Sequence, residues 1–237
     1  MISEIEVPRA HGTQRAWLAT PEGNGPHRAV LVMHEMWGLV DNLHPILERF
    51  ASEGYVALAP DLFDRKWSYV RCVARAMKAM QQGQGEAVED VHAALQWLHE
   101  RPDVDESRSA VVGFCMGGGF ALVLALSGQV AVAAPFYGSS DAFIEDASAS
   151  CPVVASFGGR DKVFAKEAKR VEEALSRANV RHDLKVYPDA GHSFMARERG
   201  NWLERLSAIG PLKVGFDEHA SEDSWRRMLG FFDETLA

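Results

Sequence analysis

The sequence predicts an α/β fold with a mostly parallel central sheet and helices on both faces. Short apolar runs alternate along the whole chain with longer segments of helical periodicity. Several runs, such as Ala29–Met33 (AVLVM) and Tyr55–Ala59 (YVALA), are apolar at every position. A strand that is apolar on both sides is typical of a parallel sheet covered by two layers of helices. The 237 residues contain no internal repeat or long linker, so we expect one domain over residues 1–237.

The strands are predicted from β-type runs bounded by turn residues. The first two are joined by a short turn near His11-Gly12-Thr13 and should pair antiparallel, whereas the later ones are separated by helices and should pair parallel. Pro60 ends the fourth strand. In chain order the expected strands are Ile2–Val7, Gln14–Thr20, Ala29–Met33, Tyr55–Ala59, Ser109–Phe114, Val130–Phe136, Val153–Phe157 and Leu184–Tyr187.

The helices are predicted from apolar residues at spacings of three and four. In the first, Leu43, Ile46, Leu47 and Phe50 share one face, and Gly54 follows its end. A glycine-glutamine break separates the second helix from the third. The last helix carries Trp225, Met228, Leu229 and Phe232 on one face. The expected helices are Asn42–Glu53, Ser68–Gln82, Gly85–Glu100, Gly117–Leu126, Lys166–Ala178 and Ser221–Leu236.

Composition and charge exclude several function classes. The net charge is −8, from 33 acidic and 25 basic residues, which argues against nucleic acid as a partner because phosphate binding needs a basic surface. No apolar run approaches the roughly 20 residues that span a bilayer, and the N-terminal residues lack a secretion-signal pattern. The three cysteines (Cys72, Cys115 and Cys151) have no metal-site spacing and fit a reducing compartment. We therefore expect a cytoplasmic protein with no membrane contact, and a monomer by default.

The pentapeptide Gly113-Phe114-Cys115-Met116-Gly117 lies between a predicted buried strand and a predicted helix. A residue at such a junction occupies a tight, strained turn that lifts its side chain clear of both elements. The two glycines lack the β-carbons that would collide across the turn. With serine at its centre this would be a nucleophile elbow. Here the centre is Cys115, which predicts an activated thiol, because a buried structural cysteine would not need this glycine pattern.

Polar residues follow several of the predicted strands. Because reactive groups gather at the carboxyl ends of parallel strands, Asp161 and His192 are expected near Cys115. The chain order nucleophile, acid, histidine matches a hydrolase triad, with an attacking thiol, an imidazole that moves protons and a carboxylate that fixes its tautomer. Asp161 has an alternative role in shaping the turn that contains it, and Asp61 is best explained as a turn or cap residue.

Glu35 lies in the segment Met33-His34-Glu35-Met36-Trp37-Gly38. The segment resembles the start of a zinc-protease helix, but Gly38 stands where the second histidine would be, so no metal is expected. The N–H groups of Met36 and Met116 are candidates for an oxyanion hole. Glu35 would face the same cavity, where a carboxylate can accept a thiol proton. A buried glutamate paired with an arginine is the alternative.

The chain resembles the dienelactone hydrolase (carboxymethylenebutenolidase) family of α/β-hydrolases over nearly its whole length. The matching segments are HEMWGL (34–39), GYVALAPDLF (54–63), VEDVHAAL (88–95), VVGFCMGGGFAL (111–122), PFYG (135–138), FGGRDKVF (157–164) and YPDAGHSF (187–194). The resemblance implies that Cys115 is the nucleophile, His192 its base and Asp161 the orienting acid. It further implies that Glu35 takes the proton of a neutral resting thiol as substrate binds.

The resemblance also implies a reaction. Cys115 would open an unsaturated lactone that carries a carboxylate, as in the breakdown of chlorinated aromatics, and water activated by His192 would cleave the resulting thioester. No cofactor is implied. Family members hold the substrate carboxylate with arginines and aromatics, for which Arg197 and Trp37 are the candidates, with Arg71, Arg75, Trp67 and Tyr69 as others. Two alternatives stay open: a general carboxylesterase or thioesterase on the same scaffold, and a non-catalytic thiol protein that senses oxidants.

Overall fold

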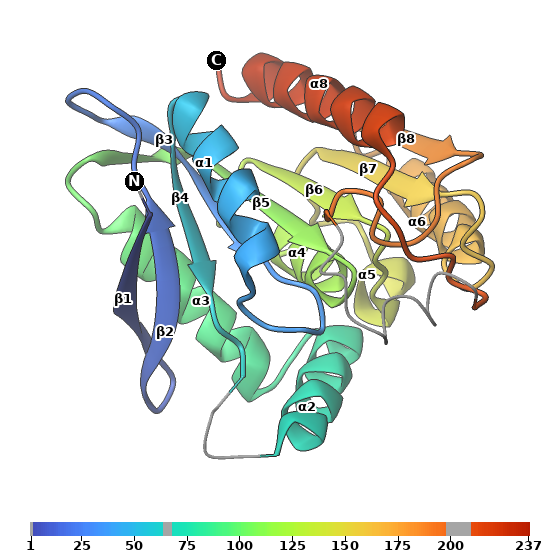
Figure 1. Ribbon diagram of the computed structural model, residues 1–237, viewed down its shortest axis with the longest axis horizontal. Coiled ribbons are helices and arrows are strands. Elements are labelled where there is room, and N and C mark those ends of the chain that lie inside the picture. The colour runs from blue at the N-terminus through green and yellow to red at the C-terminus, as the bar shows by residue number, and fades with distance from the viewer. Residues whose placement is uncertain (1, 64–67, 198–209) are drawn as a thin grey trace.

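The computed structural model describes residues 2–63, 68–197 and 210–237 of the chain. Within them, eight strands form one sheet in the order β1-β2-β4-β3-β5-β6-β7-β8 (Figure 1). β1 and β2 pair antiparallel, as do β2 and β4, and all other neighbours are parallel. The strands are β1 (Ile2–Arg9), β2 (Gly12–Ala19), β3 (His27–Met33), β4 (Tyr55–Pro60), β5 (Val104–Phe114), β6 (Val132–Phe136), β7 (Val153–Gly158) and β8 (His182–Tyr187).

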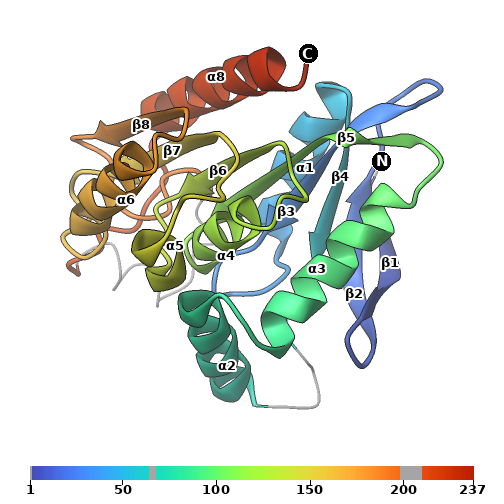
Figure 2. The same cartoon turned by 180° about the vertical axis from the view of Figure 1, so that it is seen from behind.

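Helices cover both faces of this sheet. The described helices are α1 (His44–Ser52), α2 (Tyr69–Gln82), α3 (Glu86–His99), α4 (Met116–Ala125), α5 (Asp141–Glu145), α6 (Ala165–Arg177) and α8 (Glu218–Thr235). α1 and α8 pack on one face with the apolar side chains of one core. The remaining helices pack on the other face with a second core, and they stand in front of the sheet in Figure 2. The predicted α/β architecture is confirmed.

The inner strands are buried on both sides, which explains their continuous apolar sequence. Every residue of Ala29–Met33 is fully buried, and so is nearly every residue of Tyr55–Ala59. Successive side chains of such a strand point to opposite faces. Leu31 accordingly packs in the core beneath α2 to α6, whereas Val30 and Val32 pack beneath α1 and α8. The two cores hold the strands so that their carboxyl ends meet at one edge, where the polar residues singled out above lie.

The structure differs from the prediction mainly at element ends and short elements. β5 begins at Val104 rather than Ser109, because the polar residues that precede its buried part continue in extended conformation. α4 begins at Met116, one residue before the predicted start. The helix predicted over Asn42–Glu53 is divided into a one-turn 3-10 helix over Asp41–Leu43 and α1, and the five-residue α5 was not predicted. Elements of this length are too short to show a hydrophobic period.

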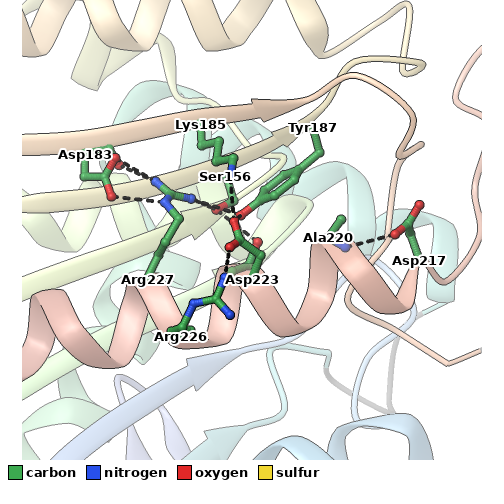
Figure 3. Close-up of polar contacts among 10 residues, drawn as sticks. Ser156, Asp183, Lys185, Tyr187, Asp217, Ala220, Asp223, Arg226 and Arg227 are labelled. Carbon is green, nitrogen blue, oxygen red and sulfur yellow. Dashed lines mark hydrogen bonds and ion pairs between the residues drawn. The ribbon is translucent and has the colours of Figure 1, made fainter.

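A polar network fastens α8 to the sheet (Figure 3). The Asp223 carboxylate accepts hydrogen bonds from Lys185 Nζ (2.6 Å) and the Tyr187 hydroxyl (2.9 Å) of β8. These partners lower the pKa of Asp223 to about 2, and the hydrogen bond from Lys185 has the largest effect. One turn further on, Arg227 reaches the Asp183 carboxylate (2.8 Å) and donates to Ser156 Oγ (3.0 Å). These bonds set the position of α8 along the outer strands.

Over the described ranges, every helix is too short or too polar to cross a membrane.

Candidate active site

Cys115 stands on the sharp turn between β5 and α4. Its φ of 54° and ψ of −116° lie in a region that residues with side chains rarely adopt. Such a conformation costs on the order of 1–3 kcal/mol and persists only where the surroundings enforce it. Its N–H donates to the Phe136 carbonyl (3.0 Å), and its own carbonyl accepts from Gly119 N–H (3.3 Å). The backbone is therefore held on both sides while the side chain, partly buried, is left to face a cavity.

Two glycines make this turn possible. A β-carbon on Gly113 would lie 1.9 Å from the Gly117 carbonyl oxygen. A β-carbon on Gly117 would lie 2.2 Å from the Met33 carbonyl oxygen and 2.7 Å from that of His34. The elbow thus packs directly against the end of β3. The missing side chains bring the loop that carries Glu35 and Met36 next to Cys115.

Asp161 and His192 come from the loops after β7 and β8 and meet in the interior. Asp161 Oδ2 lies 2.6 Å from His192 Nδ1. The other carboxylate oxygen accepts the N–H groups of Val163 and Phe164, each at 3.0 Å, at the start of α6. Both side chains are almost completely buried. Asp161 therefore shapes its turn, as the alternative prediction had it, and also orients His192.

Several groups act on the charge of His192. Burial is the largest influence and disfavours the protonated ring. It is outweighed by the negative charge of Cys115 and by hydrogen bonds with Asp161 and with the Cys115 side chain, which together raise the pKa of His192 to about 10. Phe164 and Tyr137 pack against the ring, each with centroids 4.9 Å away. Cys115, His192 and Asp161 thus form one connected series of side chains in a water-poor site, which strengthens the electrostatic coupling between them.

Glu35 is buried at the end of β3, next to Tyr137 on the loop after β6. Burial, followed by the negative charges of Glu35 and Cys115, raises the pKa of Tyr137 well above its usual value. The phenol therefore stays neutral and faces both groups. Tyr137 has a φ of 40° and Ser193, beside the histidine, a φ of 57°. Positive φ values in residues with side chains thus cluster around this site, as is common at functional sites.

A cavity of about 400 Å³ opens onto these groups. Glu35, Cys115 and His192 contribute to its lining, together with Met36, Met116 and Trp37. The rest of the described lining is Ser193 and a set of apolar residues: Val73, Met77, Phe164, Ala196, Leu212 and Val214. Met116 is the first residue of α4, where backbone N–H groups have no partner within the helix. The structure brings together the predicted catalytic residues, both oxyanion-hole candidates and Trp37.

Arg197 lies apart from this group. It is exposed, its guanidinium stacks over the Phe216 ring at 5.2 Å, and it is not among the residues that line the cavity. This geometry does not support its predicted contact with a substrate carboxylate. Arg75 is paired with Glu86 at 2.7 Å, and Arg71 is exposed. Trp67 lies outside the described residues.

The structure also defines the roles of other polar residues near the site. Asp61 forms a turn, since it accepts the Phe63 N–H (3.1 Å) and pairs with Arg15 (2.9 Å). Sequence reasoning missed Tyr137, whose only signal was its place in the PFYG segment. It also missed His34, which is fully buried beside Glu35. In the part of the chain that the structure describes, no cluster of three metal-ligating side chains occurs.

The parallel sheet, the strained elbow at the end of β5 and the acid and histidine after β7 and β8 define an α/β-hydrolase. The whole-chain comparison makes this more specific, because residues 14–236 match the dienelactone hydrolase family. The chain belongs to this family and is an ester-cleaving hydrolase.

Individual relatives agree with the assignment. A protein of Yersinia pestis, provisionally named a carboxymethylenebutenolidase, is 28% identical over 98% of this chain and 87% of its own length. A crystal structure of a provisionally named dienelactone hydrolase from Klebsiella pneumoniae has a TM-score of 0.81, with 23% identity over 98% of both chains. A dienelactone hydrolase-like promiscuous phosphotriesterase from metagenomic libraries has a TM-score of 0.79, with 24% identity over 99% of this chain and 98% of its own. At these identities the two structures support the fold.

Proposed function

We propose that the protein hydrolyses an ester or an unsaturated, dienelactone-like lactone through a thioester on Cys115. The observation that carries the proposal is the position of Cys115. It occupies a strained turn at a cavity, and its side chain is hydrogen-bonded to a histidine that a buried carboxylate orients. Asp161 holds His192 in the tautomer whose Nε2 faces the cysteine. The N–H groups of Met36 and Met116 are the proposed oxyanion hole.

The charge on His192 suggests how protons move. The negative charge of the Cys115 thiolate is the main influence that raises the pKa of His192 to about 10, so His192 is an imidazolium whenever the sulfur is charged. The proton that Cys115 loses must then go to another group. Glu35 is the nearby carboxylate, and we assign it that proton. The thiolate then attacks the carbonyl carbon, and the imidazolium of His192 gives its proton to the leaving oxygen. A thioester and a neutral imidazole result.

The second half of the reaction restores the starting state. Once Cys115 is acylated it carries no charge, so the negative charge that raised the pKa of His192 is gone. The neutral imidazole can then take a proton from water, and the hydroxide attacks the thioester carbonyl. The sulfur leaves as a thiolate and regains its proton from Glu35. The sum is one ester and one water converted to one acid and one alcohol.

The pH dependence of kcat/KM tests the role of His192. Because acylation uses the imidazolium, kcat/KM should stay high through the neutral range and fall as pH rises through about 10, the raised pKa. Asp161→Asn removes a group that raises this pKa, so the fall should begin at lower pH. The measurement is initial-rate hydrolysis of an aryl ester between about pH 6 and 11. A rise near the ordinary histidine pKa of about 6.5, with no fall near 10, would show instead that the neutral ring is needed.

The apolar wall of the cavity favours the second candidate function, a general carboxylesterase. Besides the Cys115 thiol, the titratable groups in its described lining are the Glu35 carboxyl group and the His192 imidazole. The rest of the described lining is mainly apolar. A buried carboxylate of the substrate would lie near Glu35, and like charges repel. An uncharged acyl group would instead be stabilised by contact with Val73, Met77 and Leu212.

A matched pair of substrates decides between the two candidates. Nitrophenyl butyrate and nitrophenyl hemisuccinate share a leaving group and differ in a terminal methyl against a carboxylate. We expect the butyrate to have at least about a tenfold higher kcat/KM, because burying an unpaired charge is costly. Dienelactone is assayed beside them. A preference for the hemisuccinate and dienelactone would support the carboxylate-bearing lactone, and turnover of none of the three would remove the proposed function.

A further inference from the structure

His34 is a buried histidine whose hydrogen bonds show which ring nitrogen carries the proton. Its side chain is completely inaccessible to solvent. The Leu62 N–H donates to Nε2 (3.1 Å), so Nε2 carries no proton. Nδ1 lies 2.6 Å from the Glu35 carbonyl oxygen and must donate to it. Burial, the largest influence, lowers the pKa of the ring, which keeps it neutral. The ring therefore links the loop after β3 to the loop after β4 as the neutral Nδ1–H tautomer.

The Glu35 carbonyl oxygen, which accepts the hydrogen bond from His34, belongs to the peptide group that carries the Met36 N–H. The Glu35 carbonyl and the Met36 N–H are the two ends of one planar peptide unit. When the carbonyl is fixed, the direction of the N–H is fixed with it, because the N–H lies in the same plane and points the opposite way. The Gly38 N–H donates to the same oxygen at 3.2 Å. A bond accepted by the carbonyl also polarises the peptide and makes its N–H a stronger donor.

The rest of the loop is held by other contacts. The Tyr69 hydroxyl of α2 donates to the Met36 carbonyl at 2.6 Å. The His34 backbone packs against the elbow, since its carbonyl oxygen lies 2.7 Å from where a β-carbon on Gly117 would be. Asp61 Oδ1 is 4.0 Å from His34 Nε2, and Asp61 is itself paired with Arg15. Of the side chains named here, that of His34 is the one whose hydrogen bond reaches the 35–36 peptide group.

We propose that His34 is a positioning residue for the oxyanion hole, because its Nδ1–H bond to the Glu35 carbonyl aims the Met36 N–H at the cavity. The proposal rests on the proposed function of Cys115, and it adds a role for a residue that does not touch the substrate. Loss of one oxyanion-hole donor lowers kcat by about 10²–10³. A donor that is present but wrongly aimed should cost somewhat less, on the order of 10- to 100-fold.

Two substitutions separate the two bonds of His34. In His34→Asn the side-chain amide can occupy the place of Nδ1 and still donate to the Glu35 carbonyl, but it cannot reach the Leu62 N–H. In His34→Gln the longer amide can accept from the Leu62 N–H but loses the donor at Nδ1. His182→Gln is the matched control, since His182 also bonds a nearby carbonyl through Nδ1 (Val180, 2.7 Å) and lies on β8 outside the cavity lining.

Three measurements are made on each variant: kcat and KM for nitrophenyl butyrate, inhibition by 3-phenylpropanal, and the rate of Cys115 alkylation by iodoacetamide. The aldehyde adds to Cys115 by forming a bond from sulfur to carbon. The carbonyl double bond opens, and its oxygen, which faces the oxyanion hole, takes up the thiol proton. Iodoacetamide reacts by displacement of iodide from carbon, with no oxyanion. A defect in the oxyanion hole therefore lowers kcat and weakens inhibition by the aldehyde, and it leaves the rate of alkylation unchanged.

For His34→Gln we expect kcat to fall about 10- to 100-fold and aldehyde inhibition to weaken by a similar factor, with KM and alkylation within about threefold of wild type. His34→Asn should keep most of its activity but have the lower thermal midpoint, because the Leu62 N–H is left unpaired. His182→Gln should match wild type in all three. A role in stability alone would make activity follow the thermal midpoint in both His34 variants, with alkylation changing as well, and that result would overturn the proposal.

The wild-type protein offers a test that needs no substitution. Nitrogen-15 NMR distinguishes the two neutral histidine tautomers and the imidazolium, and it should report His34 as the neutral Nδ1–H form at neutral pH. A proton on Nε2 would also overturn the proposal. If alkylated wild-type enzyme still hydrolyses the ester, the proposed function of Cys115 fails instead, and this outcome is separate from any result on His34.

Discussion

Replacement of Cys115 with alanine should lower kcat/KM for nitrophenyl butyrate by at least about a thousandfold. The substitution removes the atom that forms the thioester and leaves His192 and Asp161 in place. Water could then react only without covalent catalysis, aided by the oxyanion hole and by binding of the ester. Because alanine is smaller than cysteine and the side chain lies at a cavity, the fold should be unaffected. Initial rates and a thermal midpoint measure both effects.

Cys151→Ala is the control for this experiment. Cys151 is a partly buried cysteine of the same chain, and burial raises the pKa of its thiol to about 12. It has no place in the cavity lining, so the variant should keep wild-type activity within about twofold. If Cys115→Ala retained more than about a tenth of the activity, Cys115 would not be the nucleophile, and the alternative of a non-catalytic thiol would gain support.

Replacement of Gly117 with alanine should have the largest effect on folding. The new β-carbon would stand 2.2 Å from the Met33 carbonyl oxygen, and that oxygen belongs to the backbone of a fully buried strand. Neither β3 nor α4 can move away without disturbing both cores. We expect the free energy of unfolding to fall by more than about 3 kcal/mol, or no folded protein to form. Urea denaturation followed by circular dichroism is the measurement.

Gly230→Ala is the matched control for the glycine substitution. Gly230 lies in α8, and a β-carbon there meets nothing within 4 Å. Alanine favours the helical backbone over glycine by about 0.5–1 kcal/mol, so this variant should be slightly more stable than wild type. If Gly117→Ala unfolded within about 1 kcal/mol of wild type, the close packing of the elbow against β3 would be contradicted.

The sequence predicts much of this fold because the local signals agree with one another. Ala29–Met33 and Tyr55–Ala59 are apolar throughout because both of their faces are buried, and that pattern alone indicates a covered parallel sheet. The glycines at 113 and 117 predict the elbow because close approach of two backbones leaves no room for a β-carbon. The place of Asp161 and His192 follows from the rule that strand ends share one edge of the sheet.

Other features depend on contacts that no local pattern encodes. Tyr137 faces Glu35 and Cys115 only because the loop after β6 adopts a positive φ there. The direction of Arg197 depends on Phe216, nineteen positions along the chain. In the sequence His34 stands out only as part of a metal-like motif, whereas its proton is assigned by the Leu62 N–H on a neighbouring loop and its proposed role by the Glu35 carbonyl. Long-range partners of this kind are visible only once the chain is folded.

The central claim is that an acyl group becomes bonded to the sulfur of Cys115, and mass spectrometry of acid-quenched enzyme tests it most directly. Wild-type protein mixed with nitrophenyl butyrate and quenched during turnover should gain the mass of one butyryl group. Peptide mapping should place that group on the peptide containing Cys115, and Cys115→Ala should gain no mass. Hydrolysis at full rate with no acylated enzyme in the wild type, or a butyryl group on a different residue, would contradict the account.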